Sequence, residues 1–548
     1  MSGRKSTSGR FPVSRREFLL AASAAAASWG AYQLPRYREN VPGSLVGANH
    51  KAGHILRTKF DRTPDIEIQA GTVIVGGGVS GLSAAWWLQR NGDEQFELLE
   101  LDRKVGGNSQ SGQNRVSTYP WGAHYVPVPG PDAAHVRELF EDLGVIEGYS
   151  ADGLPIFNEY YICGAPKERL SVFGRWQTGM IPKIGIRSEE ARQFDEFDEF
   201  IAVQSERLGA DGLPAFTIPL DLSSRDPEIL EWDKISMAEF LASRGWNAKP
   251  LLWYVNYCCR DDFGSELEGT SAWAGIHYFA SRAGRAANAE DDAVLTWPEG
   301  NGWLVNQLKL KLKAHIRTQQ LVFHIENTTS GAIVDSIDTQ TMRITRRHAK
   351  AVIFSGPQFV AKHLIPELNP ERAESFEYSP WVVANLTTSR LPHETGAPLC
   401  WDNVSYASDS LGYINSGHQK LDSAPKETVL TYYWPLTKKS PAEERKSLHK
   451  ADYSFWQKKI LDDFFHMHPQ MRGKVKNLDL WFWGHGMIVP RPGMLWSGER
   501  QEAQKSVGQI HFAHSDLSGL SLFEEAQYQG VRAARACLDV SSSRGSRS

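Results

Sequence analysis

The chain has 548 residues, of which 41% are hydrophobic and 23% charged, and its formal net charge at pH 7 is −4. This is the composition of a folded globular protein, too long for one core, so it predicts two or more domains and gives no reason to expect a nucleic acid partner. Five cysteines without a C-x-x-C pair argue against a metal site and a disulfide framework, and we expect no bound metal. The adjacent Cys258 and Cys259 leave two interpretations open, a vicinal disulfide or two buried thiols.

The N-terminus has the pattern of an export signal. Arg15 and Arg16 lie in the hexapeptide S-R-R-E-F-L, and an alanine-rich run over residues 21–27 follows. That apolar run is too short to span a bilayer comfortably. The pattern resembles the twin-arginine signal, which implies the twin-arginine translocase as a partner and a periplasmic location. An uncleaved signal would add an attachment to the membrane.

A strand, a glycine-rich turn and a helix follow one another from residue 73. The β-branched residues 73–75 predict a buried strand, and the apolar run over residues 82–88 predicts a helix. Between them lies G-x-G-x-x-G, formed by Gly76, Gly78 and Gly81. Such glycines allow a tight turn, the approach of a pyrophosphate and close helix–strand packing. Glu100, at the end of a second predicted strand, is placed to accept hydrogen bonds from a ribose.

The segment after Glu100 identifies the cofactor by resemblance. Leu99-Glu100, a charged link and Val105-Gly106-Gly107 resemble the signature E…D-R-x-G-G-R of the flavin amine oxidase superfamily. Residues 296–304, 351–357 and 510–534 are similar to later motifs of that superfamily, in the same order. The resemblance implies FAD as the cofactor. It implies no covalent bond to the flavin, because no cysteine lies between Cys400 and Cys537, where monoamine oxidases have their linking cysteine.

The resemblance also implies an α/β fold class. A Rossmann-like FAD-binding domain would be assembled from residues 66–130, 295–377 and 480–540. An α+β substrate domain would be formed by residues 131–294 and 378–479. Residues 1–35 would be the export signal and residues 541–548 a tail.

By the same resemblance, one set of residues would contact FAD at the ribose, the pyrophosphate, the adenine or the flavin ring. The set consists of Gly76, Gly78, Ser80, Gly81, Glu100, Gly106, Gly107, Asn108, Gly122, Ala123, Val322, Asp516 and Phe523. Asn108 stands where relatives usually have arginine, and His514 stands where they have glycine.

Four residues are candidates for catalysis, because their segments correspond to those beside the flavin in relatives. They are His124, Tyr125, Trp483 and His485. Histidine has an ordinary pKa near neutrality and is a candidate base, and aromatic faces bind cations. Residues 260–264 interrupt a helical pattern, so we expect the acidic cluster Asp261, Asp262 and Glu266 to lie in a solvated loop, with attraction of a cationic substrate as the alternative.

The sequence therefore predicts an exported FAD-dependent oxidoreductase that oxidises the C–N bond of a cationic amine, such as a polyamine, by hydride transfer to flavin. Many amine oxidases have a lysine that holds water at the flavin, and residues 381–387, the corresponding stretch, contain none. This difference favours a quinone or cytochrome as the electron acceptor. Two alternatives remain open, a desaturase or isomerase of an apolar substrate and a redox-silent FAD-binding protein.

Overall fold

The computed structural model describes residues 41–48, 50–57, 63–369, 372, 374–420 and 425–545. Arg15 and Arg16 of the predicted export signal lie outside these residues. No helix within the described ranges has the length and apolarity needed to cross a bilayer. The chain from Pro42 onward forms one unit, and the following paragraphs concern this unit alone.

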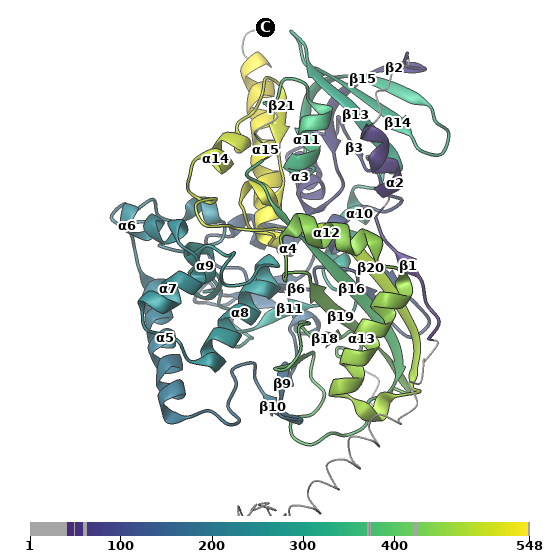
Figure 1. The fold of residues 1–548 in the computed structure, drawn as a ribbon. Helices are drawn as coiled ribbons and strands as arrows, with labels where there is room; N and C mark the ends of the chain where they lie inside the picture. Colours follow the sequence, from purple (N-terminus) through teal and green to yellow (C-terminus); the bar gives the residue numbers. More distant parts are fainter. Residues whose placement is uncertain are drawn as a thin grey trace, which may run out of the picture. The chain divides into compact units, whose positions relative to one another are not determined.

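A seven-stranded sheet forms the upper part of the unit in Figure 1. Its order is β12 (Ile316–Arg317), β3 (Phe96–Leu99), β2 (Ile66–Val75), β15 (Ile344–Phe354), β14 (Ala332–Asp338) and β13 (Gln320–Asn327), with β21 (Ile510–Phe512) paired to β15. The pairs of β2 with β3 and β15 are parallel, as in a dinucleotide-binding sheet. Strands from three separate stretches of sequence therefore build this one sheet.

Helices α3 (Val79–Arg90) and α15 (Phe523–Gly545) pack on each other beside this sheet, with α10 (Gly302–Lys311) against α3. Their close contact depends on small residues. A Cβ at Gly530 of α15 would lie 2.2 Å from the carbonyl oxygen of Ser80 in α3. Helix α15 continues to Gly545, and so extends into the stretch that we expected to be a tail.

An eight-stranded sheet forms the second part. Its order is β1 (Leu45–Val46), β20 (Val475–Ile488), β16 (Tyr378–Ser389), β19 (Glu427–Pro435), β18 (Tyr413–Asn415), β17 (Asp402–Ser405), β9 (Glu168–Val172) and β10 (Arg175–Thr178). Helices α12 (Pro441–Lys450) and α13 (Tyr453–Met467) pack on its long strands. The boundary expected at residue 480 falls inside β20, which belongs to this sheet.

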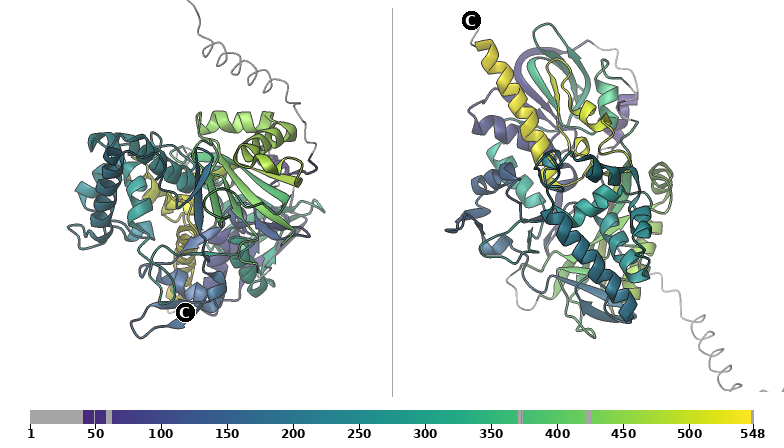
Figure 2. Two further views of the ribbon diagram at one scale, coloured as in Figure 1. Left: turned by 90° about the horizontal axis from the view of Figure 1, so that it is seen from below. Right: turned by 90° about the vertical axis from the view of Figure 1, so that its left-hand side faces the viewer.

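A layer of helices lies on the side of the second part opposite α12 and α13, at the left of Figure 1 and in both views of Figure 2. Its helices are α5 (Ser188–Glu206), α6 (Pro227–Leu230), α7 (Met237–Ser243), α8 (Lys249–Phe263) and α9 (Ala272–Ala280). Smaller elements complete the unit. They are α2 (His50–Gly53), α4 (Ala134–Asp142), α11 (Gln358–Leu364), α14 (Glu499–Gln504), β4 (Ser111–Gln113), β5 (Thr118–Pro120), β6 (Tyr125–Pro127), β7 (Ile146–Tyr149), β8 (Pro155–Phe157) and β11 (Val294–Thr296).

The end of α8 corrects one expectation. The helix does not break at Arg260 but runs to Phe263, and Gly264, with φ of 60°, ends it in the left-handed conformation. Asp261 and Asp262 therefore lie in the last helical turn and not in a solvated loop, and Asp262 is only 5% exposed. Cys258 and Cys259, on the same helix, are free and buried thiols.

Candidate active site

A cavity of about 350 Å³ lies where β2 and β3 end and α3 begins. All but two of the residues predicted to bind the cofactor line it. Those that line it are Gly76, Gly78, Ser80, Glu100, Gly106, Gly107, Asn108, Ala123, Val322, Asp516 and Phe523. The carboxyl ends of parallel strands are where dinucleotides bind in such sheets, and we name this space the cofactor cavity.

Gly81 and Gly122 do not line the cofactor cavity, and each has a packing role instead. A Cβ at Gly81 would lie 2.0 Å from the carbonyl oxygen of Gly76, and one at Gly122 would lie 2.3 Å from that of Asn108. These glycines allow the helix and the turn to approach their neighbours. Gly81 thus has the helix-packing role that the glycine pattern assigns to it.

The start of α3 at Gly78 has room for a phosphate group. It is the N-cap of α3 and provides no side-chain cap, so the first amides of the helix remain available to a ligand. Its backbone is in an ordinary extended conformation, with φ of −72°. A Cβ built there would meet no atom within 4 Å. The open space at Gly78 is therefore part of the cavity, not a packing contact.

Glu100 is held at the end of β3 by backbone amides. Its Oε2 accepts a hydrogen bond of 2.7 Å from the Gly77 amide, and its Oε1 accepts one of 2.7 Å from the Asp102 amide. Burial raises the pKa of Glu100 to about 7. A fixed carboxyl group at this position can accept a hydrogen bond from a ribose hydroxyl.

We expect Glu100→Ala to weaken FAD binding by about 1.5–3 kcal/mol, the scale of a hydrogen bond to a charged group. Titration of the apoprotein with FAD, followed by flavin fluorescence, measures this loss. Glu100→Gln retains one acceptor oxygen and should lose less. Equal affinity in Glu100→Ala and the wild type would show that this carboxyl does not contact the cofactor.

Asp516 lines the cofactor cavity, but protein groups already engage it. Its Oδ2 accepts hydrogen bonds from the Gln358 amide at 2.8 Å and from the Tyr378 hydroxyl at 2.6 Å. His514, which replaces the usual glycine, places its Nδ1 3.1 Å from the other carboxylate oxygen. The acid therefore joins α11 and β16 at the wall of the cavity.

A second, smaller cavity of about 130 Å³ adjoins the first, and we name it the amine cavity. The two share a set of lining residues, which are Asn108, Ala123, Gly486, Ser521, Leu522 and Phe523. Asn108, at this junction, donates a hydrogen bond from Nδ2 to the carbonyl oxygen of Gly486. No lysine lines either cavity within the described residues.

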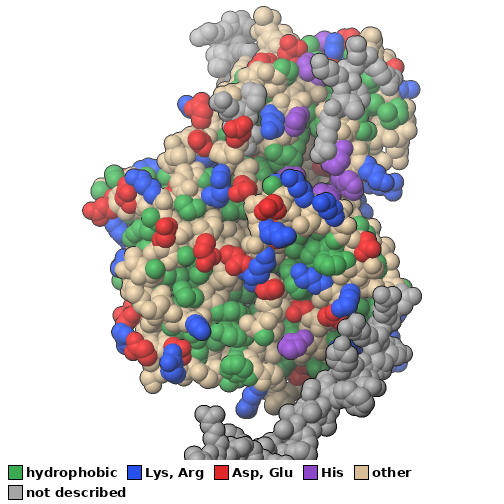
Figure 3. Space-filling view, viewed as in Figure 1, with side chains coloured by type: hydrophobic (Ala, Val, Ile, Leu, Met, Phe, Trp, Pro, Cys, Tyr) green, Lys and Arg blue, Asp and Glu red, His purple; other side chains and the backbone are tan. Residues whose placement is uncertain are grey.

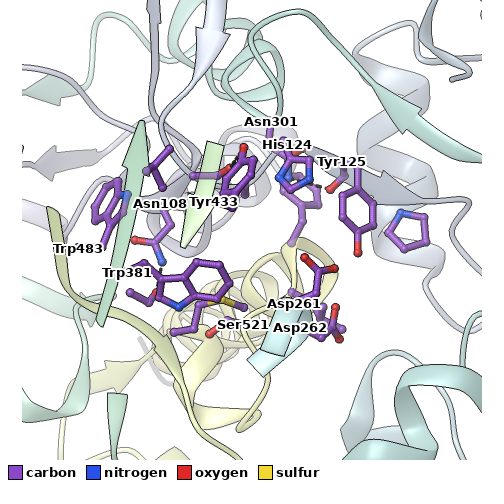
Figure 4. Close-up of a pocket in the computed structure, with 18 of the residues that line it drawn as sticks. Asn108, His124, Tyr125, Asp261, Asp262, Asn301, Trp381, Tyr433, Trp483 and Ser521 are labelled. Atoms are coloured by element: carbon purple, nitrogen blue, oxygen red, sulfur yellow. Dashed lines mark hydrogen bonds between the residues drawn. The ribbon is translucent and has the colours of Figure 1, made fainter. Parts of the chain in front are cut away.

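Aromatic rings form much of the amine cavity (Figure 4). The ring of His124 stacks on Tyr433, with centroids 4.5 Å apart. The Tyr433 hydroxyl donates to the carbonyl oxygen of Gly122 at 2.9 Å, and the Trp483 indole donates to that of Trp121 at 2.6 Å. Burial lowers the pKa of His124 to about 4, so this ring is neutral at neutral pH. These rings can receive a cationic or apolar ligand while they exclude water.

The four predicted catalytic residues are not all brought together. His124, Tyr125 and Trp483 line the amine cavity, whereas His485 lines only the cofactor cavity. The ring of His485 stacks on Phe359, with centroids 4.1 Å apart. Part of the side chain is exposed, but desolvation by the surrounding protein, followed by the charge of Arg445, lowers its pKa to about 4. His485 therefore does not face the space where a substrate would lie.

Buried carboxyl groups also line the amine cavity. From the sequence, a role for Asp261 and Asp262 was only the alternative, and Glu524 was not identified. Asp262 pairs with Arg282 at 2.6 Å. Among the described residues Asp261 forms no salt bridge, although the Tyr125 hydroxyl hydrogen-bonds to it, and burial raises its pKa to about 7. Glu524, only 2% exposed, has its pKa raised by burial to about 7. Asp261 and Glu524 therefore add two carboxyl groups to the cavity beside the Asp262–Arg282 pair, and the charge of Arg282, which also lines the cavity, acts on both.

Glu525, the neighbour of Glu524, does not line the cavity, but its titration should make the free energy of unfolding depend on pH. It is fully buried, its Oε1 accepts from the Leu220 amide at 2.6 Å, and burial raises its pKa to about 8. Above pH 4.5, the ordinary pKa of a glutamate, Glu525 loses its proton in the unfolded chain but keeps it in the folded protein. The contribution of Glu525 to the free energy of unfolding should therefore fall by roughly 1.4 kcal/mol per pH unit up to about pH 8.

The variant Glu525→Gln, which keeps an acceptor oxygen for Leu220, should remove that pH dependence. Denaturant unfolding of both proteins between pH 5 and pH 9 measures the difference. We expect the variant to gain stability relative to the wild type as pH rises, and parallel pH profiles would show that Glu525 does not titrate in this range.

Comparisons with known proteins bear on the fold. A profile described as the NAD(P)-binding Rossmann-like domain matches residues 74–143. The flavin-containing amine oxidase B of Sus scrofa is 22% identical over 329 residues, which are 58% of this chain and 54% of that protein. The chain thus spans about half the length of this curated relative.

Solved structures cover more of the chain. A putrescine oxidase bound to putrescine superposes with a TM-score of 0.63 at 16% identity, over 86% of this chain and 100% of that one. Cyclohexylamine oxidase from Brevibacterium oxydans gives 0.60 at 14% identity, over 86% and 99%. The fold is that of the flavin-containing amine oxidases. A fatty acid isomerase from P. acnes has the same fold, with a TM-score of 0.56 at 14% identity over 84% and 97%.

This amine oxidase fold and its Rossmann-like domain are consistent with non-covalently bound FAD. The residues of this chain fit that group. Gly78 leaves space for a pyrophosphate beside free helix amides, and Glu100 offers a carboxyl group for a ribose. The cofactor cavity shares lining residues with the amine cavity and would place the flavin end of the cofactor next to a substrate.

Proposed function

We propose that this protein is an exported FAD-dependent enzyme that oxidises the C–N bond of a cationic amine. One observation supports the substrate class above the others. Asp261 and Glu524 put two carboxyl groups into an aromatic cavity that adjoins the cofactor cavity, and Asp262 is already paired. Three carboxyl groups and one arginine line this cavity, and burying excess negative charge is costly, so a cationic ligand would be the natural partner.

The bound flavin would supply the hydride acceptor. The aromatic walls at His124, Tyr433 and Trp483 would orient the substrate carbon and exclude water. The carboxylates would hold an ammonium group. A carboxyl group whose pKa is near 7, as at Glu524, would also be suited to take the proton that an amine must lose before its C–H bond breaks. Water would then hydrolyse the imine to an aldehyde or ketone.

Anaerobic mixing of the FAD-loaded protein with a panel of amines and apolar alkenes tests this proposal. We expect diamines and polyamines to bleach the flavin absorbance. Bleaching by apolar alkenes alone would favour a desaturase. Bleaching by dithionite but by no organic compound would favour a redox-silent protein.

Export has a separate test, since Arg15 and Arg16 form the essential pair of the predicted signal. Lysine matches the charge of arginine but not its planar guanidinium geometry. We expect Arg15→Lys/Arg16→Lys to leave folded, yellow precursor in the cytoplasm of a host that has the twin-arginine translocase. Cell fractionation with flavin absorbance measures this, and equal periplasmic yield from the double variant would contradict the route.

A further inference from the structure

The cofactor cavity reaches the protein surface at His485, away from the amine cavity. His485 is exposed, and it lines the cofactor cavity together with Leu56, Val360 and Tyr378. None of these four residues lines the amine cavity. The stacking of His485 on Phe359 fixes the ring at this opening. A partner could therefore approach the cofactor here without passing the substrate.

Basic and histidine side chains converge on this opening. A Cβ at Gly484 would lie 3.8 Å from His449 Nε2 and 3.9 Å from Arg445 Cδ, so α12 lies directly over β20 at this point. The ring of His50 lies 6.4 Å from that of His449 and 5.7 Å from that of His54. The segment 50–57, α12 and β20 thus meet beside His485.

We name this surface the histidine rim. It consists of His50, Lys51, His54, Lys362, His363, Arg445, Lys446, His449, Lys450 and His485. Figure 3 shows histidines together with Lys and Arg side chains around a hollow between the regions of α11 and α12. Five of its ten side chains are lysine or arginine, although the whole chain has a net charge of −4. The acidic residues of α12, Glu443 and Glu444, lie in its first turn, at the opposite end from Lys450.

We propose that the histidine rim is the docking surface for an acidic electron-carrier protein that reoxidises the cofactor. The proposal rests on the proposed function, because only a reduced cofactor has electrons to give. Exposed lysines attract an acidic partner over distance and raise its association rate. Two oxidised carriers would each take one electron and become reduced, and the two protons of the reduced cofactor would pass to water.

Binding can be measured without any turnover. Cytochrome c is basic, and its succinylated form is acidic while it retains the same haem. We expect the oxidised, FAD-loaded protein to bind the succinylated form at low ionic strength and the native form at least 10-fold more weakly. Added salt should weaken the favoured complex. Equal binding of the two forms, binding of neither, or binding that salt leaves unchanged would overturn the proposal.

Two charge-matched variants locate the surface. Lys446→Glu/Lys450→Glu reverses two exposed charges on the rim, and Arg175→Glu/Lys183→Glu makes the same change at and beyond β10, at the far edge of the eight-stranded sheet from β20. We expect the first variant to lose about 10-fold in affinity for succinylated cytochrome c and the second to retain wild-type affinity. Equal losses in both variants would contradict a specific rim.

Electron transfer is tested on flavin reduced by light, which needs no amine and so separates this proposal from the substrate assignment. The succinylated cytochrome should be reduced about 10-fold faster than the native form, and Lys446→Glu/Lys450→Glu should remove that preference. The proposal would be overturned if the two cytochromes reacted equally fast and a quinone reoxidised the flavin at a high rate that Lys446→Glu/Lys450→Glu left unchanged.

Discussion

The variant Gly78→Val should fold normally and contain no FAD. A Cβ at Gly78 meets nothing within 4 Å, and the backbone there has a φ that any residue adopts. The valine side chain would therefore strain nothing in the apoprotein, but it would occupy the space that the pyrophosphate needs. We expect the purified variant to lack flavin absorbance and to show no saturable FAD binding in a fluorescence titration.

Gly148→Val is the matched control. Gly148 also has open space at its Cβ position, but it lies in β7, away from both cavities. This variant should retain wild-type FAD content. Circular dichroism and thermal unfolding of both apoproteins separate loss of the site from loss of the fold. A Gly78→Val protein that purifies with a full complement of FAD would show that the cofactor cavity is misassigned.

The second large effect concerns Asp261. We expect Asp261→Asn to lower kcat/KM for a diamine about 100-fold, the scale of losing one partner of a buried charge pair. The loss of kcat/KM should be smaller for butylamine, which lacks the second ammonium group of 1,4-diaminobutane. Asp195→Asn, at an exposed position of α5, should leave both substrates unaffected. Equal losses for the two amines would contradict a role for Asp261 in binding the second charge.

The pH dependence of this effect has a definite sign. Burial raises the pKa of Asp261 to about 7, so the group is a neutral acid below that pH and a carboxylate above it. Only the carboxylate attracts an ammonium group. The ratio of wild-type to Asp261→Asn kcat/KM should therefore be near one below about pH 6 and rise through pH 7 to its full value. A ratio that is constant with pH would show that Asp261 does not titrate in the free enzyme.

The cofactor cavity could be predicted from the sequence because its determinants are local. The strand, the glycine turn and the first helix are contiguous. Gly76 has a positive φ of 108°, Gly81 has no room for a Cβ, and Gly78 leaves space for a ligand. Glu100 follows directly from the end of β3. Gly81 and Gly122, the two predicted residues that do not line the cavity, pack against residues that do, since Gly81 packs on Gly76 and Gly122 packs on Asn108.

The amine cavity was less predictable, because tertiary packing decides which charges are buried. The run Arg260 to Gly264 has the composition of a loop, yet the helix continues through it and packing of Arg282 on Tyr278 and Asp262 removes it from water. Glu524 is one of two adjacent acids in the first turn of α15, and the sequence alone does not tell which of them faces the cavity. His485 was expected near the substrate, but the register of β20 against β16 shifts between Trp483 and Met487, and His485 lines only the cofactor cavity.

The most direct test of amine oxidation is a single turnover followed by stopped flow. The FAD-loaded protein is mixed without oxygen with 1,4-diaminobutane, and in parallel with the same compound deuterated at both carbons next to nitrogen. We predict that the flavin absorbance bleaches in one phase and that deuterium slows this phase several-fold, because the C–H bond breaks as the flavin is reduced. Flavin that stays oxidised with every amine, while dithionite bleaches it at once, would contradict the account.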